Sequence, residues 1–129
     1  MSEIRYALDA SALLAVFLHE LRAEQVHDLL PKSVISSVNI SEAVAKMQER
    51  GMPEKQIVET VADLRFQIVV FDTAQAIRAG RMRTATRTKG LSLGGRACLA
   101  LAIGEGATAV TTDGARSGLD LPVPVLLIR

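Results

Sequence analysis

Short apolar runs alternate along this chain with longer segments in which apolar residues recur at helical spacing. The runs predict strands at residues 4–8, 33–38, 67–71, 109–112 and 125–128. The longer segments predict helices at residues 11–20, 23–30, 40–50, 53–65, from 73 onward, and 94–103. Strands that are apolar on both faces and separated by helices are typical of a parallel sheet between helical layers. We therefore predict an α/β fold, a three-layer α/β/α domain with a mainly parallel five-stranded sheet.

Turn and capping residues support several of these boundaries. Gly51 ends one predicted helix, and Pro53 suits the first turn of the next. Asp72 is expected to cap the helix that begins at Thr73. The run at residues 67–71, which is continuously apolar from Ile68, is expected to be a buried strand.

Composition limits the kind of protein. A chain of 129 residues has the size of one domain, and we expect a single domain over residues 1–129. Hydrophobic residues make up 49%, which argues against disorder. Aromatic residues make up only 3%, and this argues against nucleic-acid binding by base stacking on aromatic platforms. The net charge of +1 gives no general attraction to polyanions, so RNA binding requires a local basic patch.

The single cysteine and the start of the chain bear on location. Cys98 lies in an apolar helical segment, and one cysteine excludes an intrachain disulfide or a thiolate zinc cluster. The apolar residues 7–18 are interrupted by Asp9 and are too few to cross a bilayer. We expect a cytoplasmic protein with no signal peptide, no membrane span and a buried Cys98.

Three carboxylates stand in otherwise apolar surroundings. Asp9 ends the first predicted strand, and Asp113 ends the fourth. Glu42 lies in the first turn of the helix predicted after the second strand. Carboxyl ends of parallel strands meet at one edge of a sheet, where ligand sites form. Carboxylates gathered there would repel one another unless a cation joined them, and oxygen ligands suit Mg²⁺ or Mn²⁺. Such a site suits phosphodiester hydrolysis.

Each carboxylate also has a purely structural interpretation. Asp9 can cap the helix after it, and Asp113 can open a turn with Gly114. Glu42 can complete a capping box that starts at Asn39. For a single residue the structural interpretation is favoured, whereas three acids in register at strand ends favour a site.

Three polar side chains accompany these acids. Ser11 follows Asp9 by two residues, Asn39 precedes Glu42 by three, and Thr111 precedes Asp113 by two. Each can orient a carboxylate from behind the metal ligands. Helix capping explains Asn39 equally well.

Four short segments, in order, resemble the acidic motifs of PIN domains, and of the VapC toxins in particular. Residues 8–15 (LDASALLA) are similar to the first motif and residues 39–42 (NISE) to the second. Residues 90–100 (GLSLGGRACLA) resemble the third and residues 110–113 (VTTD) the fourth. Each motif alone is a weak signal, but the ordered set extends over nearly the whole chain.

The resemblance implies a PIN-like fold and a Mg²⁺- or Mn²⁺-dependent endoribonuclease, the toxin of a type II toxin–antitoxin pair. It implies a homodimer, inhibition by a small VapB-like antitoxin, and structured RNA substrates such as tRNA or ribosomal RNA. Asp9, Glu42 and Asp113 match the motif acids, and we carry them over as metal ligands and catalytic residues.

The third motif departs from the family pattern. The family usually places Asp directly before the Arg-Ala pair, and here that position is Gly95. Glycine has no side chain that can bind a metal, and it costs a helix interior about 1 kcal/mol relative to alanine. Two explanations compete: an inactivating substitution, which we favour, and a naturally degenerate member kept for binding. Glu105 and Asp120 are other acids, but neither lies in the motif.

Basic residues crowd the segment before the third motif, namely Arg78, Arg81, Arg83, Arg87 and Lys89, with Arg96 just after Gly95 and Arg116 after Asp113. Such a strip beside an acidic pocket is expected to hold the RNA backbone. We single out Arg83, Arg87, Arg96 and Arg116 for RNA binding. The alternative is an ordinary solvated helix face.

Two further hypotheses remain open. One is a catalytically inactive PIN module that binds antitoxin or RNA. The other is a phosphoacceptor receiver domain, which is also parallel α/β with an acidic pocket. A receiver needs an acceptor Asp after the third strand, where Asp72 stands, and a Lys after the fifth, where Arg129 stands instead. The receiver therefore ranks last.

Overall fold

The computed structural model describes residues 3–86, 90–114 and 123–128. The sheet consists of β1 (Tyr6–Leu8), β2 (Ser33–Ser36), β3 (Gln67–Val69), β4 (Thr108–Thr111) and β5 (Val125–Leu127). The helices are α1 (Ala10–Phe17), α2 (Ala23–His27), a 3₁₀ turn (Leu30–Lys32), α3 (Ser37–Glu49), α4 (Glu54–Ala62), α5 (Thr73–Arg81), α6 (Arg83–Thr86) and α7 (Leu93–Glu105). Strands and helices thus alternate as predicted.

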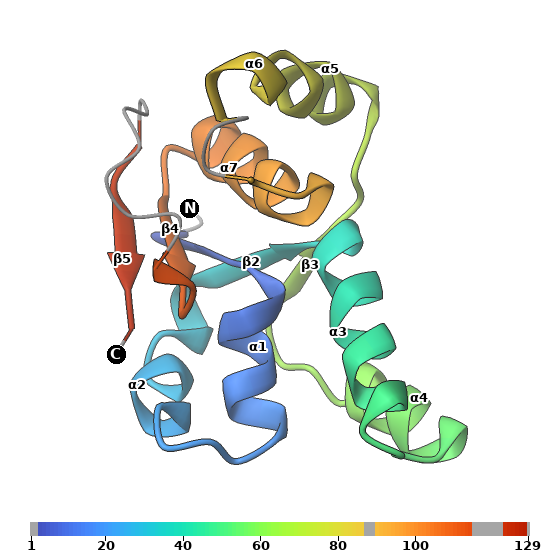
Figure 1. Ribbon diagram of the computed structural model, residues 1–129. Coiled ribbons are helices and arrows are strands. Elements are labelled where there is room, and N and C mark those ends of the chain that lie inside the picture. Colours follow the sequence, from blue (N-terminus) through green and yellow to red (C-terminus); the bar gives the residue numbers. More distant parts are fainter. Residues whose placement is uncertain (1–2, 87–89, 115–122, 129) are drawn as a thin grey trace.

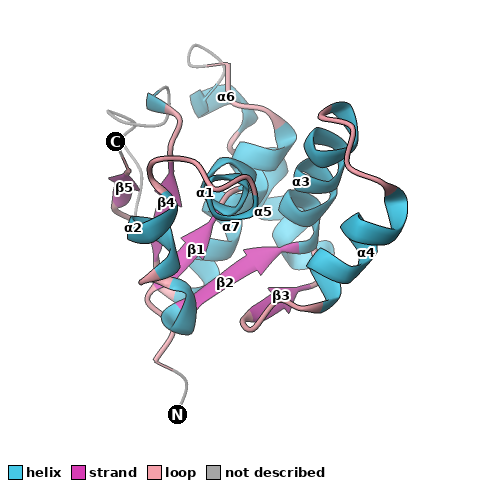
Figure 2. Ribbon diagram, turned by 90° about the horizontal axis from the view of Figure 1, so that it is seen from below, coloured by secondary structure: helices cyan, strands magenta, loops and turns pink. Residues whose placement is uncertain are grey.

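All four strand pairings are parallel, in the order β3-β2-β1-β4-β5 (Figure 2). The predicted five-stranded parallel sheet is confirmed. β1 is the central strand, and Leu8 pairs with Ile35 of β2 and with Val110 of β4. Receiver domains have the order 2-1-3-4-5, so the observed order excludes that alternative.

The sheet buries its two faces in two separate cores. Ala7, Val34 and Ala109 lie in the core on the α7 side, which also contains Cys98. Their neighbours Leu8 and Val110 lie in the opposite core with α1 and α2. This alternation follows from the two-residue period of side chains along a strand. Figure 1 shows the resulting layers, with α5, α6 and α7 on one side of the sheet and α1 and α2 on the other.

The junction between β2 and α3 differs from the prediction. The strand was expected to reach Val38 and the helix to start at Ile40, but β2 ends at Ser36 and α3 starts at Ser37. The reason is the cap: Ser36 Oγ accepts a hydrogen bond from Val38 N at 3.2 Å. Asn39 is therefore inside the helix, and the prediction of a capping box from Asn39 to Glu42 is wrong.

The strand β3 was predicted to be buried, and this is also wrong. β3 lies at one edge of the sheet, next to β2 alone. Ile68 is 38% exposed, and Val70, just after the strand, is 73% exposed. The apolar run marks strand propensity, but it does not reveal whether a second strand or a helix will cover the strand.

Other local predictions are confirmed. Asp72 caps α5 by accepting a hydrogen bond from Gln75 N at 2.9 Å, and Cys98 is buried. Gly106 ends α7 with φ 63°, a left-handed conformation that suits glycine. The predicted helix at 23–30 is shorter, because α2 ends at His27 and a 3₁₀ turn containing Pro31 follows. Within the described ranges, every helix is too short or too polar to cross a membrane.

Candidate acidic site at the carboxyl edge of the sheet

Asp9 occupies the centre of the carboxyl edge of the sheet. It directly follows β1 and is only 1% exposed. Its Oδ1 accepts hydrogen bonds from Ala12 N at 2.9 Å and from Ser11 Oγ at 2.6 Å. Asp9 therefore caps α1, as the structural interpretation predicted, and it does so from a position deep in the edge.

Ser11 links this carboxylate to the end of β4. Its Oγ accepts a hydrogen bond from Thr112 N at 2.9 Å and lies 3.3 Å from Thr111 Oγ1. Thr111 Oγ1 in turn accepts from Asp113 N at 2.9 Å. We call Asp9, Ser11, Thr111 and Asp113 the β1–β4 cluster. Two predicted acids and two predicted polar partners thus lie in one hydrogen-bonded group, with Asp113 at its exposed end.

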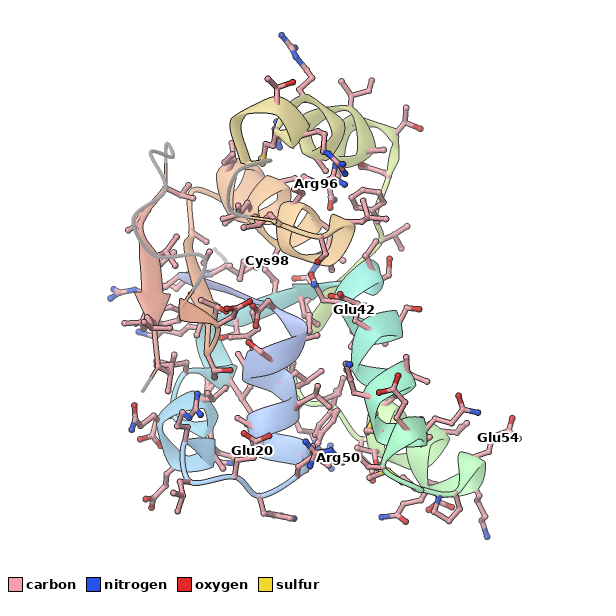
Figure 3. All side chains as sticks on the ribbon, viewed as in Figure 1. Glu20, Glu42, Arg50, Glu54, Arg96 and Cys98 are labelled. Atoms are coloured by element: carbon pink, nitrogen blue, oxygen red, sulfur yellow. The ribbon has the colours of Figure 1, made fainter. Side chains whose placement is uncertain are left out.

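Glu42 is in the second turn of α3 and belongs to a different group. Asn39 Nδ2 donates to Glu42 Oε1 at 3.1 Å and to the carbonyl oxygen of Gly94 at 2.9 Å. We call Asn39, Glu42 and Gly94 the α3–α7 contact. The predicted pairing of Asn39 with Glu42 is thus present in the structure. Figure 3 shows Glu42 on α3 facing the start of α7.

The thiol of Cys98 is close enough to respond to Glu42. Burial, with a smaller contribution from the negative charge of Glu42, raises the pKa of Cys98 to about 12. Cys98 Sγ donates to the carbonyl oxygen of Ala7 at 3.5 Å, two residues before Asp9. The Glu42 charge therefore affects the pKa of a thiol that is hydrogen-bonded to β1, the strand that Asp9 directly follows.

Gly95, the altered motif position, lies in the first turn of α7. Ser92 caps this helix, and its Oγ accepts a hydrogen bond from Gly95 N at 3.3 Å. Gly95 is buried and offers no donor or acceptor side chain. Glu105 is ten residues further along the same helix, roughly 15 Å away, so it does not replace the missing acid. Asp120 lies outside the described residues.

Two of the basic residues join helices. Arg78 Nη1 donates to the carbonyl oxygen of Ala100, and Arg96 Nη1 donates to that of Ala79, both at 3.2 Å. The two arginines thus connect α5 and α7 reciprocally. Figure 3 shows Arg96 directed from α7 toward α5. RNA contact by Arg96 stays a prediction, and in the structure its guanidinium already binds a backbone carbonyl.

The other predicted RNA contacts are distributed differently. Arg83 begins α6 and is exposed. Arg87, Lys89 and Arg116 lie outside the described residues. Among the four arginines singled out for RNA, Arg83 is the one that the structure describes as exposed.

Arg22 is a neighbour of the site that the sequence did not indicate. Its Nη1 lies 3.5 Å from the carbonyl oxygens of Thr112 and Ile128, just past the ends of β4 and β5. Arg22 directly precedes α2, and no pattern in the sequence distinguishes it. Its contacts, 90 and 106 residues away along the chain, depend on how α2 packs beside the sheet.

The residues present fit a sparsely ligated hard cation. The donors are oxygens, and Asn39, which binds Glu42, has a buried Oδ1 without a hydrogen-bond partner among the described residues. In the described part of the chain, no three His, Cys, Asp or Glu side chains gather into a metal-binding group. Mg²⁺ commonly uses one or two carboxylates and keeps several waters, so a protein cage is not required.

A groove beside α3 lies away from these carboxylates. A groove of about 730 Å³ between α3 and α4 is lined by Val44, Gln48, Met52, Glu54, Ile57, Val58, Val61 and Ala62. It contains none of the predicted site residues. The acidic edge is therefore identified by its chemistry and hydrogen bonds, since this groove has a mainly apolar lining.

Several solved structures with the same fold come from toxin–antitoxin systems. The DNA-bound VapBC complex of Salmonella typhimurium superposes with a TM-score of 0.73 at 17% identity, covering 95% of this chain and 96% of that one. The Mycobacterium tuberculosis VapC20 toxin, which cleaves the sarcin–ricin loop, gives 0.72 at 14% identity, covering 88% and 95%. The DNA-bound VapBC2 complex of Rickettsia felis gives 0.67 at 24% identity, covering 95% and 97%.

Sequence comparison gives the family. No protein of curated function matches the chain. The family model of the PIN domain matches residues 6–117, which contain β1 to β4 and all the predicted acidic positions. Together with the parallel sheet in the order β3-β2-β1-β4-β5, this match covers most of the chain, and the chain therefore belongs to the PIN-domain family.

Proposed function

We propose that this chain is a VapC-type toxin, an endoribonuclease that hydrolyses phosphodiester bonds in RNA of the tRNA or ribosomal RNA class with Mg²⁺ or Mn²⁺. We propose further that Gly95 weakens the activity, because the usual acid is missing there. Likeness to the sarcin–ricin-loop-cleaving toxin of Mycobacterium tuberculosis supports the substrate class.

The observation that carries this proposal is the buried Asp9 at the centre of the carboxyl edge. A carboxylate that is 1% exposed is unfavourable unless it is hydrogen-bonded or balanced by positive charge. Capping of α1 accounts for Oδ1, and Ser11, which donates to Oδ1, also accepts from Thr112 N and lies beside Thr111 Oγ1 at the end of β4. Helix capping alone does not require this connection to a second strand end.

The proposed roles follow from these positions. Asp9, Glu42 and Asp113 hold the cation, which supplies a Lewis acid that offsets charge on the phosphodiester. Ser11 orients the Asp9 carboxylate, Thr111 holds the backbone N–H of Asp113, and Asn39 orients Glu42. Arg83 is the exposed candidate for contact with the RNA backbone, to which Arg87, Arg96 and Arg116 are added as sequence-based candidates.

The proposed partners are RNA, a VapB-like antitoxin and a second copy of this chain. Several similar structures are toxin–antitoxin complexes, from Klebsiella pneumoniae, Salmonella typhimurium and Rickettsia felis among others. These are partners of the related proteins, and they motivate the same proposal for this chain.

One observation favours a second candidate function, a catalytically inactive PIN module that binds antitoxin or RNA. Gly95 is buried in the first turn of α7 and leaves the third motif without a carboxylate. If the remaining acids bind the cation too weakly, only the binding surfaces retain a use.

The deciding experiment compares the chain with its Gly95→Asp variant on tRNA and ribosomal RNA with Mn²⁺ or Mg²⁺. Position 95 is the third residue of α7, where an acid also interacts favourably with the helix dipole, so we expect the variant to fold. We expect Gly95→Asp to cleave RNA at least about a hundredfold faster than the parent. This is the lower end of the rate effect that one positioned catalytic side chain usually has.

Two controls accompany this comparison. EDTA should abolish cleavage, and a Gly95→Asp/Glu42→Gln variant should return to the parent rate. Calorimetric titration with Mn²⁺ measures metal binding without RNA. If Gly95→Asp neither binds Mn²⁺ more tightly nor cuts any of the RNAs, the nuclease proposal fails and the binding module is favoured.

A further inference from the structure

Glu42 and Gly94 meet where α3 packs against α7. Gly94 is buried, and Glu42 is half-buried. A Cβ atom built on Gly94 would overlap the Glu42 carboxyl group, including Oε1, Cδ and Oε2. The whole carboxyl group therefore lies against the α7 backbone in space that any other residue at position 94 would fill.

Asn39 fixes the same carboxylate. Its Nδ2 donates to Glu42 Oε1 and to the carbonyl oxygen of Gly94. Both acceptors are oxygens, so the amide nitrogen and not the amide oxygen must face them. Asn39 is completely buried, which holds its amide in one orientation. One amide group thus ties the Glu42 carboxylate to the backbone of α7.

This arrangement has two energetic costs that packing alone does not explain. Asn39 Oδ1 is buried without a hydrogen-bond partner in the described part of the chain, which is unfavourable. Gly94, the second residue of α7, has a lower helix propensity than alanine. Both costs occur at the point where Glu42 touches α7.

We infer that Gly94 is a positioning residue: the absence of a Cβ, together with the Asn39 amide, gives the Glu42 carboxylate a fixed seat against the first turn of α7. The inference rests on the proposed function only for the use of that carboxylate as a metal ligand. A larger residue at position 94 would move the far end of a flexible glutamate side chain, so the fold survives while Glu42 leaves its seat.

The test is a glycine-to-alanine series with a built-in control. Gly80, in α5, has open space where a Cβ would stand, so Gly80→Ala should raise the folding equilibrium constant, by up to about fivefold. Gly94→Ala should not show that gain, and its folding equilibrium constant should be at least threefold below that of Gly80→Ala. In a Glu42→Ala background the overlap is gone, and Gly94→Ala should then stabilise as Gly80→Ala does. Urea unfolding of the full chain measures all variants.

The decisive quantity is the coupling between positions 42 and 94. A coupling of threefold or more in the folding constant supports the seat, whereas additive effects overturn it. If Gly94→Ala does not fold, rescue by Glu42→Ala supports the inference. If Gly94→Ala/Glu42→Ala also fails while Glu42→Ala folds, the obstacle is not Glu42 and the inference is overturned.

A second measurement separates this inference from the nuclease proposal. In the Gly95→Asp background, Gly94→Ala should weaken Mn²⁺ binding about tenfold or more in calorimetry, and Gly80→Ala should leave it unchanged. Coupling between positions 42 and 94 without any Mn²⁺ binding would support the inference about Gly94 and contradict the nuclease proposal. Undiminished Mn²⁺ binding and RNA cleavage by Gly94→Ala would reject the role of Gly94 and keep the nuclease.

Discussion

The β1–β4 cluster and the α3–α7 contact hold their acids in different ways. Asp9 is fixed by residues two and three positions further along the chain, and Ser11 connects it to a neighbouring strand. Glu42 is fixed by an amide that also bonds to Gly94, a residue 55 positions from Asn39. Sheet pairing therefore places the first group, whereas the packing of two helices places the second.

The difference indicates which group is more sensitive to substitution. In the β1–β4 cluster, capping is a common interaction that several residue types can supply. In the α3–α7 contact, one completely buried amide makes both bonds and no other described side chain duplicates it. We expect single changes to be most damaging at the contact between the helices.

The largest effect is expected from Asn39→Ala. It removes both bonds and leaves the carbonyl oxygen of Gly94 and the Glu42 carboxylate without the amide, which should lower the free energy of unfolding by about 2–3 kcal/mol. Urea unfolding measures the change, with exposed Gln48→Ala on the same helix as the control, expected within about 0.5 kcal/mol. Equal effects of the two variants would contradict the comparison.

A smaller loss is expected from Asp9→Ala. The variant loses the cap of α1 and the bond from Ser11, which should lower the free energy of unfolding by about 1–2 kcal/mol. Asp9→Asn keeps a capping oxygen and should stay within about 0.5 kcal/mol of the parent. Thermal and urea unfolding should agree. A loss in Asp9→Asn as large as in Asp9→Ala would mean that the charge, and not the cap, stabilises the edge.

Alkaline pH should lower the free energy of unfolding through the buried thiol of Cys98 in α7. Burial, with a further contribution from Glu42, raises the pKa of Cys98 from 9.0 to about 12. Between these values the unfolded thiol loses its proton while the folded thiol keeps it. The stabilisation is therefore complete below pH 9 and is lost as the pH rises toward 12, by about 1 kcal/mol per pH unit. Cys98→Ala should lack this pH-dependent loss, and urea unfolding of both proteins from pH 8 to pH 11 measures it. If the free energy of unfolding fell equally with pH in the parent and in Cys98→Ala, the thiol would not be the cause.

The smallest effects concern the arginines on the other side of α7. Arg96→Ala removes the bond to Ala79 and should cost about 1 kcal/mol, whereas exposed Arg83→Ala should cost less than about 0.5 kcal/mol. In an RNA-binding titration the order should reverse, with Arg83→Ala the weaker binder. If Arg96→Ala bound RNA poorly while its free energy of unfolding equalled that of the parent, Arg96 would be an RNA contact and not a structural residue.

Much of the fold follows from sequence patterns, because apolar runs and caps such as Asp72 are local signals. The acids at strand ends were also predictable, since Asp9 and Asp113 interrupt apolar or β-prone segments. The start of α3 was mispredicted because Ser36, Ser37 and Asn39 are all plausible caps and only the structure selects Ser36. The exposure of β3 depends on its place at the sheet edge, which no local pattern specifies.

The parts of the site that the sequence did not indicate depend on distances between elements. No sequence pattern distinguishes Gly94 from Gly80. Only the packing of α3 against α7, which places Glu42 beside Gly94, distinguishes the two glycines. Arg22 and Arg96 carry charges that resemble those of a solvated surface, but the structure bonds them to backbone carbonyls of other elements. Sequence reasoning located the acids, and the tertiary contacts show what surrounds each one.

The adjacent glycines at the start of α7 have a consequence for the dynamics of the site. Each lowers helix propensity by about 1 kcal/mol, so the first turn opens with a smaller free energy than the alanine- and leucine-rich turns that follow. Local opening of that turn separates Gly94 from Glu42 and Asn39 while the rest of the helix stays packed. In hydrogen exchange, the amide of Arg96 should exchange by local opening, and those of Leu99 to Leu101 by global unfolding.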